Sequence, residues 1–144
     1  MATLIEQLAP KETVEQLEHS LAQELPAQID ALFPGLAEKI REGTASLEDV
    51  ESLLQHVSSV PSGLKVPLLQ FLRLKKGWLL LRHDRAKPAL RESEEVLKIS
   101  EPAPKAWTLK AIALLRLERF AEACKAFERA YQLQNTSAVS RTYT

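Results

Sequence analysis

Two consecutive segments, residues 70–103 and 104–137, repeat one pattern over 34 residues without a gap, and this period constrains the fold more than any other feature of the chain. The corresponding residues are small or aliphatic in both segments: Gly77 and Ala111, Ala89 and Ala123, Val96 and Ala130, Ile99 and Leu133. Small residues allow two helices to cross closely, and a period of about 20–50 residues is typical of stacked helical repeats. We therefore expect pairs of antiparallel helices in this half of the chain.

The second segment has the clearer helical pattern. Residues at four- and three-residue spacings form two apolar stripes: Trp107, Ala111 and Leu114 in the first, and Ala123, Phe127 and Ala130 in the second. A break near Glu118 and Arg119 separates the stripes. This spacing predicts two amphipathic helices joined by a tight turn.

Both predicted helices of the second segment resemble the tetratricopeptide repeat (TPR) family. The resemblance assigns Trp107 to the large residue near the start of the first helix and Phe127 to the aromatic residue at the helix crossing. Arg73 and Ser93 stand at these positions in the first segment, which we interpret as a degenerate repeat. The resemblance covers 68 of the 144 residues. It implies an all-α fold in which TPR-like antiparallel helix pairs, a fragment of an α-solenoid, follow an irregular N-terminal helical section.

Charge divides the chain near residue 66. Residues 1–66 carry eleven acidic and four basic side chains, a net charge of −7, whereas residues 67–144 carry eight acidic and fifteen basic side chains, a net charge of +7. Opposite charges of this size attract at contact distance, so the acidic section is expected to pack on the repeats. The alternative is that each set of charges forms a solvated helix face. We interpret residues 67–137 as the repeats and residues 138–144 as a polar tail or the start of a truncated element.

Capping residues and helix breakers predict the N-terminal helices. Hydroxyl residues followed three positions later by an acid predict two helix starts, at Thr3 and Ser46. Gly43 is expected to end a short helix in the left-handed conformation. Prolines and a glycine mark the boundary before the repeats, at Pro61, Gly63 and Pro67.

The sequence contains no arrangement typical of an enzyme or a metal site. His19, His56 and His83 stand alone, without a second ligand at metal-binding spacing. The single cysteine, Cys124, excludes an internal disulfide, and we expect it to be packed structurally rather than reactive. We therefore predict no enzymatic activity, no metal and no cofactor. The chain has neither a secretory leader nor a membrane-spanning run, which predicts a cytoplasmic protein, with the nucleus as the alternative.

The TPR resemblance implies a partner-binding groove lined by the first helix of each repeat. Its members are apolar with a basic fringe: Phe71, Leu74, Lys75, Trp78, Leu81, Arg82, Lys105, Leu109, Ile112, Leu115 and Arg116. Family members that bind a C-terminal carboxylate use asparagines and lysines, whereas Leu74, Trp78 and Leu109 stand at the matching positions here. We therefore expect an amphipathic helix with an acidic polar face as the partner. The acidic stretch of residues 10–33 is a candidate for occupying the groove within the same chain.

The sequence is compatible with two functions. The first is a protein–protein interaction scaffold or adaptor in a multiprotein complex, with a co-chaperone-like role. The second is an RNA-binding helical repeat, indicated by a basic cluster of Lys75, Lys76, Arg82, Arg85, Lys87 and Arg91, although base-stacking aromatic residues are missing. The end of the chain lacks a polar closing helix. It is expected to continue into a further element, to pack on a second copy or a partner, or to fray.

Overall fold

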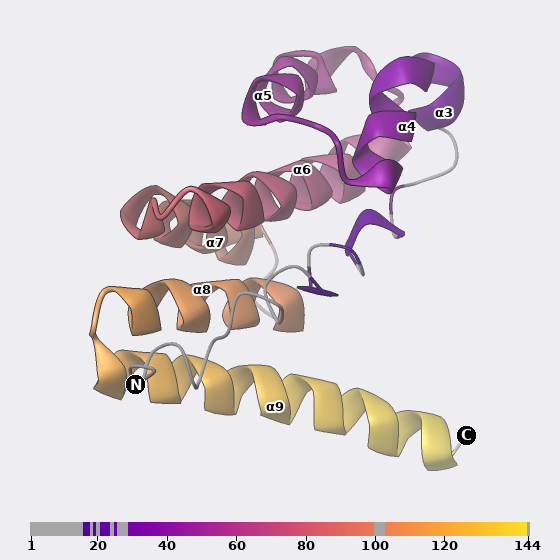
Figure 1. Ribbon diagram of the computed structural model, residues 1–144. Coiled ribbons are helices and arrows are strands. Elements are labelled where there is room, and N and C mark those ends of the chain that lie inside the picture. Colours follow the sequence, from indigo (N-terminus) through magenta and orange to yellow (C-terminus); the bar gives the residue numbers. More distant parts are fainter. Residues whose placement is uncertain are drawn as a thin grey trace.

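The computed structural model describes residues 16–17, 19, 21–23, 25, 29–99 and 103–143, with only the backbone for residue 30 and residues 135–143. Helices make up this part of the chain and it contains no strand, so the predicted all-α fold is confirmed (Figure 1). In chain order the elements are α3 (Ile29–Leu32), α4 (Pro34–Glu42), α5 (Leu47–Gln55), the short 3-10 helix η1 (Val57–Ser59), α6 (Ser62–Arg82), α7 (Ala86–Ile99), α8 (Pro104–Arg116) and α9 (Phe120–Tyr143).

Helices α6 to α9 form two hairpins that repeat with the predicted period. Asp84 lies in the turn after α6 with φ 59°, and Glu118, 34 residues later, lies in the turn after α8 with φ 62°. Both turns use the same pattern of hydrogen bonds, in which Arg85 N–H donates to Leu80 O and Arg119 N–H donates to Leu114 O. This pattern is a Schellman motif, which ends a helix through one residue in the left-handed conformation. The break expected near Glu118 is therefore a helix terminus.

The hairpins stack because small residues let their helices approach. Helix α7 packs against both α6 and α8, while α9 packs mainly against α8 and forms the outermost layer in Figure 1. Gly77 of α6 lies directly against the side chain of Leu109 of α8, where an added Cβ would overlap Leu109 Cδ2. Ala111 and Ala123 are also buried. The close crossing expected at Gly77 is thus present, and Ala111 and Ala123 lie in the core.

The N-terminal helices begin and end largely where their capping residues predict. Ser46 and Asp49 form a reciprocal capping box at the start of α5, and Gly43 ends α4 with φ 79°. The backbone N–H of Ser46 donates to Asp49, and this hydrogen bond lowers the pKa of the Asp49 carboxyl. The helix start predicted at Thr3 and most of the stretch of residues 10–28 lie outside the described residues.

Two predicted boundaries differ from the structure. Helix α6 begins at Ser62, so the boundary placed at residue 66 falls inside it, and Pro67 lies within the helix rather than before it. Pro67 is the sixth residue of α6, so the helix lacks the hydrogen bond that this residue would donate to Gly63 O, and the burial of Leu68, Phe71 and Leu72 offsets that loss. Residues 138–143 continue α9 instead of forming a separate tail or element.

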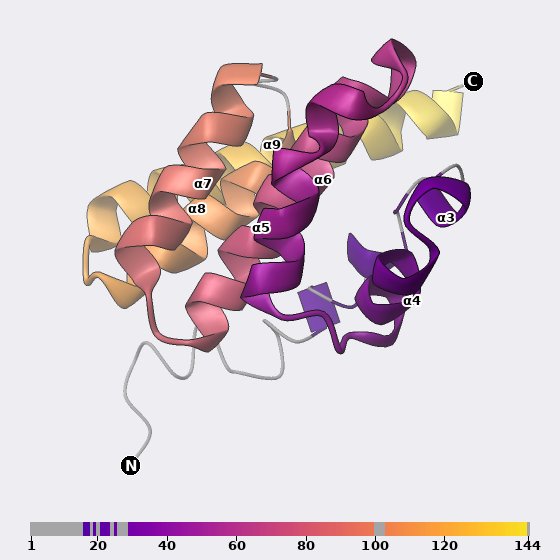
Figure 2. The ribbon, with the colours of Figure 1, turned by 90° about the horizontal axis from the view of Figure 1, so that it is seen from above.

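The acidic and basic sections share one apolar core. Leu21, Leu25 and Ile29 belong to the same buried cluster as Leu72 of α6 and Leu109 of α8. Helix α5 packs on α6, as the view from above shows (Figure 2). The expected packing of the N-terminal section on the repeats therefore holds for the residues that the structure describes.

An ion-pair network joins the two sections across α5, α6 and α7. Lys76 Nζ lies 3.6 Å from Glu51 Oε1 of α5 and 3.3 Å from Glu92 Oε1 of α7, and Arg73 Nη1 lies 3.1 Å from Glu92 Oε2. At this site the acidic section meets the basic section directly. Some of the opposite charges of the two sections therefore form ion pairs between them, while others lie on solvated surfaces.

Candidate functional site

The predicted partner groove is not an open surface in this structure. Its eight central members are buried, with the following exposed fractions: Phe71 5%, Leu74 7%, Lys75 1%, Trp78 2%, Leu81 0%, Leu109 0%, Ile112 2% and Leu115 3%. Among the remaining members, Arg82 is exposed, whereas Lys105 and Arg116 are half-buried. The prediction of an accessible apolar groove is therefore wrong for this arrangement of the chain.

The physical reason is that these side chains form the shared core. The apolar members of the predicted groove belong to one buried cluster with residues of the N-terminal section, including Leu21 and Ile29. Burying one large apolar side chain stabilises a fold by about 1.5–3 kcal/mol, so a face this apolar gains much from being covered. Periodicity places the groove residues on one face of α6 and α8, but it does not reveal what lies on that face.

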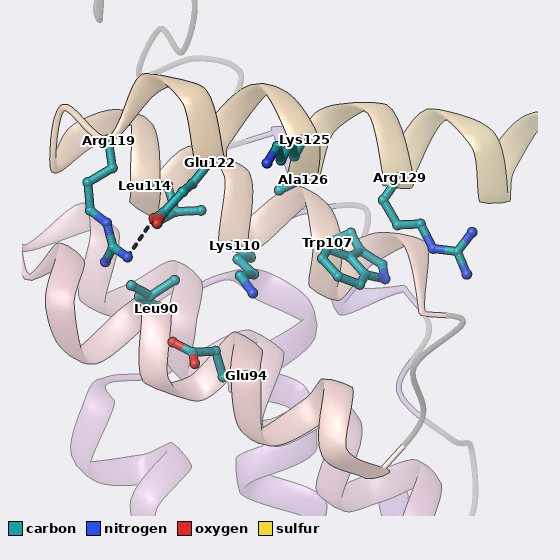
Figure 3. A pocket seen from close by; sticks show the side chains of 10 residues that line it. All are labelled: Leu90, Glu94, Trp107, Lys110, Leu114, Arg119, Glu122, Lys125, Ala126 and Arg129. Carbon is teal, nitrogen blue, oxygen red and sulfur yellow. Dashed lines mark ion pairs between the residues drawn. The ribbon is translucent and has the colours of Figure 1, made fainter.

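A different concave surface remains open, between α7, α8 and α9. We call it the basic cleft; it has a volume of about 420 Å³ and is lined by Leu90 and Glu94 of α7, Trp107, Lys110 and Leu114 of α8, Arg119 before α9, and Glu122, Lys125, Ala126 and Arg129 of α9. Figure 3 shows these side chains converging from the three helices. None of them belongs to the predicted groove.

Helical spacing brings the lining residues to one side of each helix. Trp107, Lys110 and Leu114 lie at three- and four-residue intervals, which places them on one face of α8. Lys125 and Arg129 lie one turn apart on α9 and approach the cleft from the opposite wall (Figure 3). The Schellman turn sets this geometry, because it fixes the angle at which α9 returns along α8.

The cleft combines an apolar floor with a positive rim. Leu90, Leu114 and Ala126 are buried, while Trp107 is half-buried and accessible from the cleft. Four basic and two acidic side chains line it, which gives a net charge of +2. One of the acids, Glu122, forms an ion pair with Arg119. The Nζ atom of Lys110 lies 5.2 Å from the centroid of the Trp107 ring, a cation–π contact that holds a positive charge above the floor.

The side chains of the cleft offer an aromatic ring, apolar carbon and basic groups, with which it can bind a ligand. The cleft is lined by no serine, cysteine or histidine, and the described residues contain no group of three or more metal-ligating side chains. Cys124, which we expected to be packed, is exposed on α9. Within the part of the chain that the structure covers, no helix is long and apolar enough to cross a membrane.

Sequence reasoning missed the cleft because it followed only the inner faces of the repeats. The sequence does contain one indication of the cleft. Lys125 and Arg129 are four residues apart on α9, and Trp107 and Lys110 are three residues apart on α8. Such intervals give basic helix faces, but only the structure brings the two faces together across α7. Comparison of the chain with known proteins finds no matching family model, no matching curated protein and no matching solved structure.

Proposed function

We propose that this chain is a protein–protein interaction scaffold of the TPR type, acting as an adaptor or in a co-chaperone-like role. We propose further that it binds an acidic, amphipathic helical segment of another protein in the basic cleft. The observation that supports this most directly is the combination of an accessible Trp107 with a surplus of basic side chains in a cleft between stacked helical hairpins. The partner chemistry is the one expected from the sequence, whereas the site has moved from the inner groove to the opposite side of α8.

The two parts of the cleft would contribute differently to binding. A leucine-type side chain inserted against Trp107 and Leu90 would supply most of the affinity, at about 1.5–3 kcal/mol for each buried side chain. Exposed ion pairs with Lys110 and Lys125 would add about 0–1 kcal/mol each, and they would fix the orientation of the acidic segment. Salt should therefore weaken binding only modestly.

The RNA-binding alternative has less support. Of the six basic residues that suggested it, Lys75 is only 1% exposed, and Lys76 is engaged with Glu51 and Glu92. The remaining cations, such as Lys87 and Arg91, are exposed but lack stacking aromatic residues beside them in the sequence. Single-stranded RNA without stacking would depend on charge alone, and its affinity would fall steeply with salt.

A peptide-binding assay tests the proposal. The probe is a fluorescein-labelled 14-residue peptide with leucines on one helical face and glutamates elsewhere, and fluorescence anisotropy measures its affinity for the full chain. We expect the double variant Lys110→Glu, Lys125→Glu to weaken binding at least about tenfold. The matched control, Lys87→Glu with Arg91→Glu, changes the same charge outside the cleft and should have little effect.

Two results would count against the proposal. In the first, a peptide with lysines in place of the glutamates binds equally well, which removes the basis for charge complementarity. In the second, a 12-nucleotide uridine RNA binds more tightly than the peptide and loses its affinity in the Lys87→Glu, Arg91→Glu variant, which favours the RNA alternative.

We also propose that the protein functions in the cytoplasm or the nucleus. Its cysteine has an exposed thiol. Thiols of this kind persist in the reducing environment of those compartments.

A further inference from the structure

Helix α9 has two apolar faces, and the rest of the described chain covers only one of them. The covered face contains Ala123, Ala126 and Ala130, which are 1%, 2% and 5% exposed. The second face, which we call the α9 stripe, consists of Phe120, Cys124, Phe127 and Tyr131. Three of these rank among the exposed large hydrophobic residues, with Phe120 42%, Phe127 36% and Tyr131 69% exposed, and Cys124 is also exposed.

The equivalent face of the preceding hairpin is covered. The residues 34 positions before the α9 stripe are Ala86, Leu90, Ser93 and Leu97 of α7. Leu90 and Ser93 are buried, and the other two are half-buried. Helix α7 packs against α6 and α8, whereas the main contacts of α9 are with α8. No helix among the described residues covers the α9 stripe, although it is a helix-packing face, which also explains why Phe127 is not enclosed at a helix crossing as the TPR resemblance implied.

We propose that a second copy of this chain covers the α9 stripe, through antiparallel pairing of the two α9 helices. The intervals between the stripe residues are four, three and four, so the stripe reads the same in both directions. In an antiparallel pair about a two-fold axis, Phe120 lies opposite Tyr131 of the second copy, and Cys124 lies opposite Phe127 of the second copy. Each pairing therefore occurs twice about the two-fold axis, as an isologous interface requires, and both members of each pair are apolar.

The residues that flank the stripe favour the same occupant. Ala121, which is exposed beside the stripe, is small, so on that side the two helix backbones can approach closely. The one charged flanking residue, Glu128, lies opposite Ala121 of the second copy in this register, so no like charges face each other. The stripe extends over 12 residues, from Phe120 to Tyr131, a rise of about 16 Å along the helix axis. An interface of this size is small, so the dimer should form at micromolar concentrations rather than lower ones.

The first experiment measures the mass of the full chain by sedimentation equilibrium between about 1 and 500 µM. We expect a reversible monomer–dimer equilibrium in the wild-type chain. The double variant Phe120→Glu, Tyr131→Glu should raise the dimer dissociation constant about 100-fold, because two symmetric apolar contacts each lose about a factor of ten. Leu32→Glu with Ile99→Glu is the matched control, since these two side chains are similarly exposed, at 45% and 38%, but lie on other helices.

A second experiment tests the register and remains informative if the charged variants fail to fold. Phe127→Cys places a thiol opposite the native Cys124 of the second copy, and mild oxidation should convert this variant into a covalent dimer at concentrations where the wild-type chain is dimeric. Gln132→Cys, which faces away from the stripe on the same helix, should give much less. The proposal is overturned if the chain stays monomeric up to about 500 µM, if the stripe variant dimerises as well as the wild type, or if Gln132→Cys cross-links as readily as Phe127→Cys.

Discussion

Replacing Gly77 with alanine tests whether α6 and α8 cross as closely as the structure indicates. At an open helical position this exchange stabilises a protein by about 1 kcal/mol, because alanine has the higher helix propensity. At Gly77, however, the added Cβ would overlap Leu109 Cδ2 and would lie 3.3 Å from both Leu109 Cγ and Leu109 Cδ1. All three carbons of the side-chain end are involved, and Leu109 is fully buried. A rotation of the leucine would therefore displace other core atoms.

The steric effect should outweigh the propensity effect. Forcing extra volume into a packed core destabilises by about 1–3 kcal/mol, which exceeds the gain of about 1 kcal/mol from alanine. We therefore expect Gly77→Ala to lower the free energy of unfolding by about 1 kcal/mol. For a chain of this length, that loss corresponds to a decrease of roughly 3 °C in melting temperature.

Urea unfolding followed by circular dichroism measures the change, with Gly63→Ala as the matched control. Gly63 lies in the same helix, and an added Cβ there meets nothing within 4 Å. That variant should be neutral or stabilised by up to about 1 kcal/mol. In a Leu109→Ala background, Gly77→Ala should no longer destabilise and should instead behave like Gly63→Ala, because the obstructing side chain is gone and only the helix-propensity gain remains. If Gly77→Ala stabilises the chain as much as Gly63→Ala does, the close crossing of α6 and α8 is refuted.

The remaining predictions concern helix ends. Glu118→Gly should stabilise the chain by about 0.5–1 kcal/mol in thermal unfolding, because Glu118 has φ 62° and glycine adopts this conformation without strain; Glu128→Gly, inside α9, should instead destabilise by about 1 kcal/mol. Ser46→Ala should destabilise by about 1 kcal/mol, since it removes the side-chain cap of α5, and an unchanged melting temperature would contradict that role. The backbone N–H of Ser46 lowers the pKa of Asp49, so Asp49 adds stability above the ordinary pKa of about 3.9 and loses it as the pH falls through the lowered value. Asp49→Asn should therefore reduce stability at pH 7, and the difference from the wild type should shrink below about pH 4 in urea titrations.

The sequence predicted the local features of the fold well because neighbouring residues determine them. The capping box at Ser46, the left-handed Gly43 and the break near Glu118 all depend on hydrogen bonds within a few residues. The 34-residue period also predicted the two hairpins, because it records small residues such as Gly77 where helices cross. By contrast, Pro67 suggested a boundary that α6 overrides. Pro67 costs α6 one hydrogen bond in its second turn, whereas the ten buried residues that follow stabilise the helix through packing that a local sequence signal does not contain.

The candidate site could not be predicted in the same way. Their spacing predicts that Trp78 and Ile112 line one accessible apolar face, but both are buried in the core shared with the N-terminal section. The basic cleft depends on the distance between Lys110 of α8 and Lys125 of α9, which is set by the packing of three helices. Spacing along one helix contains no information about that distance.

The predictions for both surfaces were wrong for one physical reason. The sequence does not show how many helices pack on a given face. The sequence predicts a groove on an apolar face of α6 and α8 that is in fact covered, and it predicts a packed crossing position for Phe127 of α9, which the described residues leave 36% exposed. Hydrophobicity is the same in both cases, because a residue destined for a core and one destined for an interface both favour leaving water. The exposed fractions of residues at equivalent repeat positions distinguish a core residue from an interface residue. Ser93 is 0% exposed and its counterpart Phe127 is 36% exposed, so the larger apolar side chain stands at the less covered position. A folding core alone gives no reason for that inversion, whereas a contact with another molecule does.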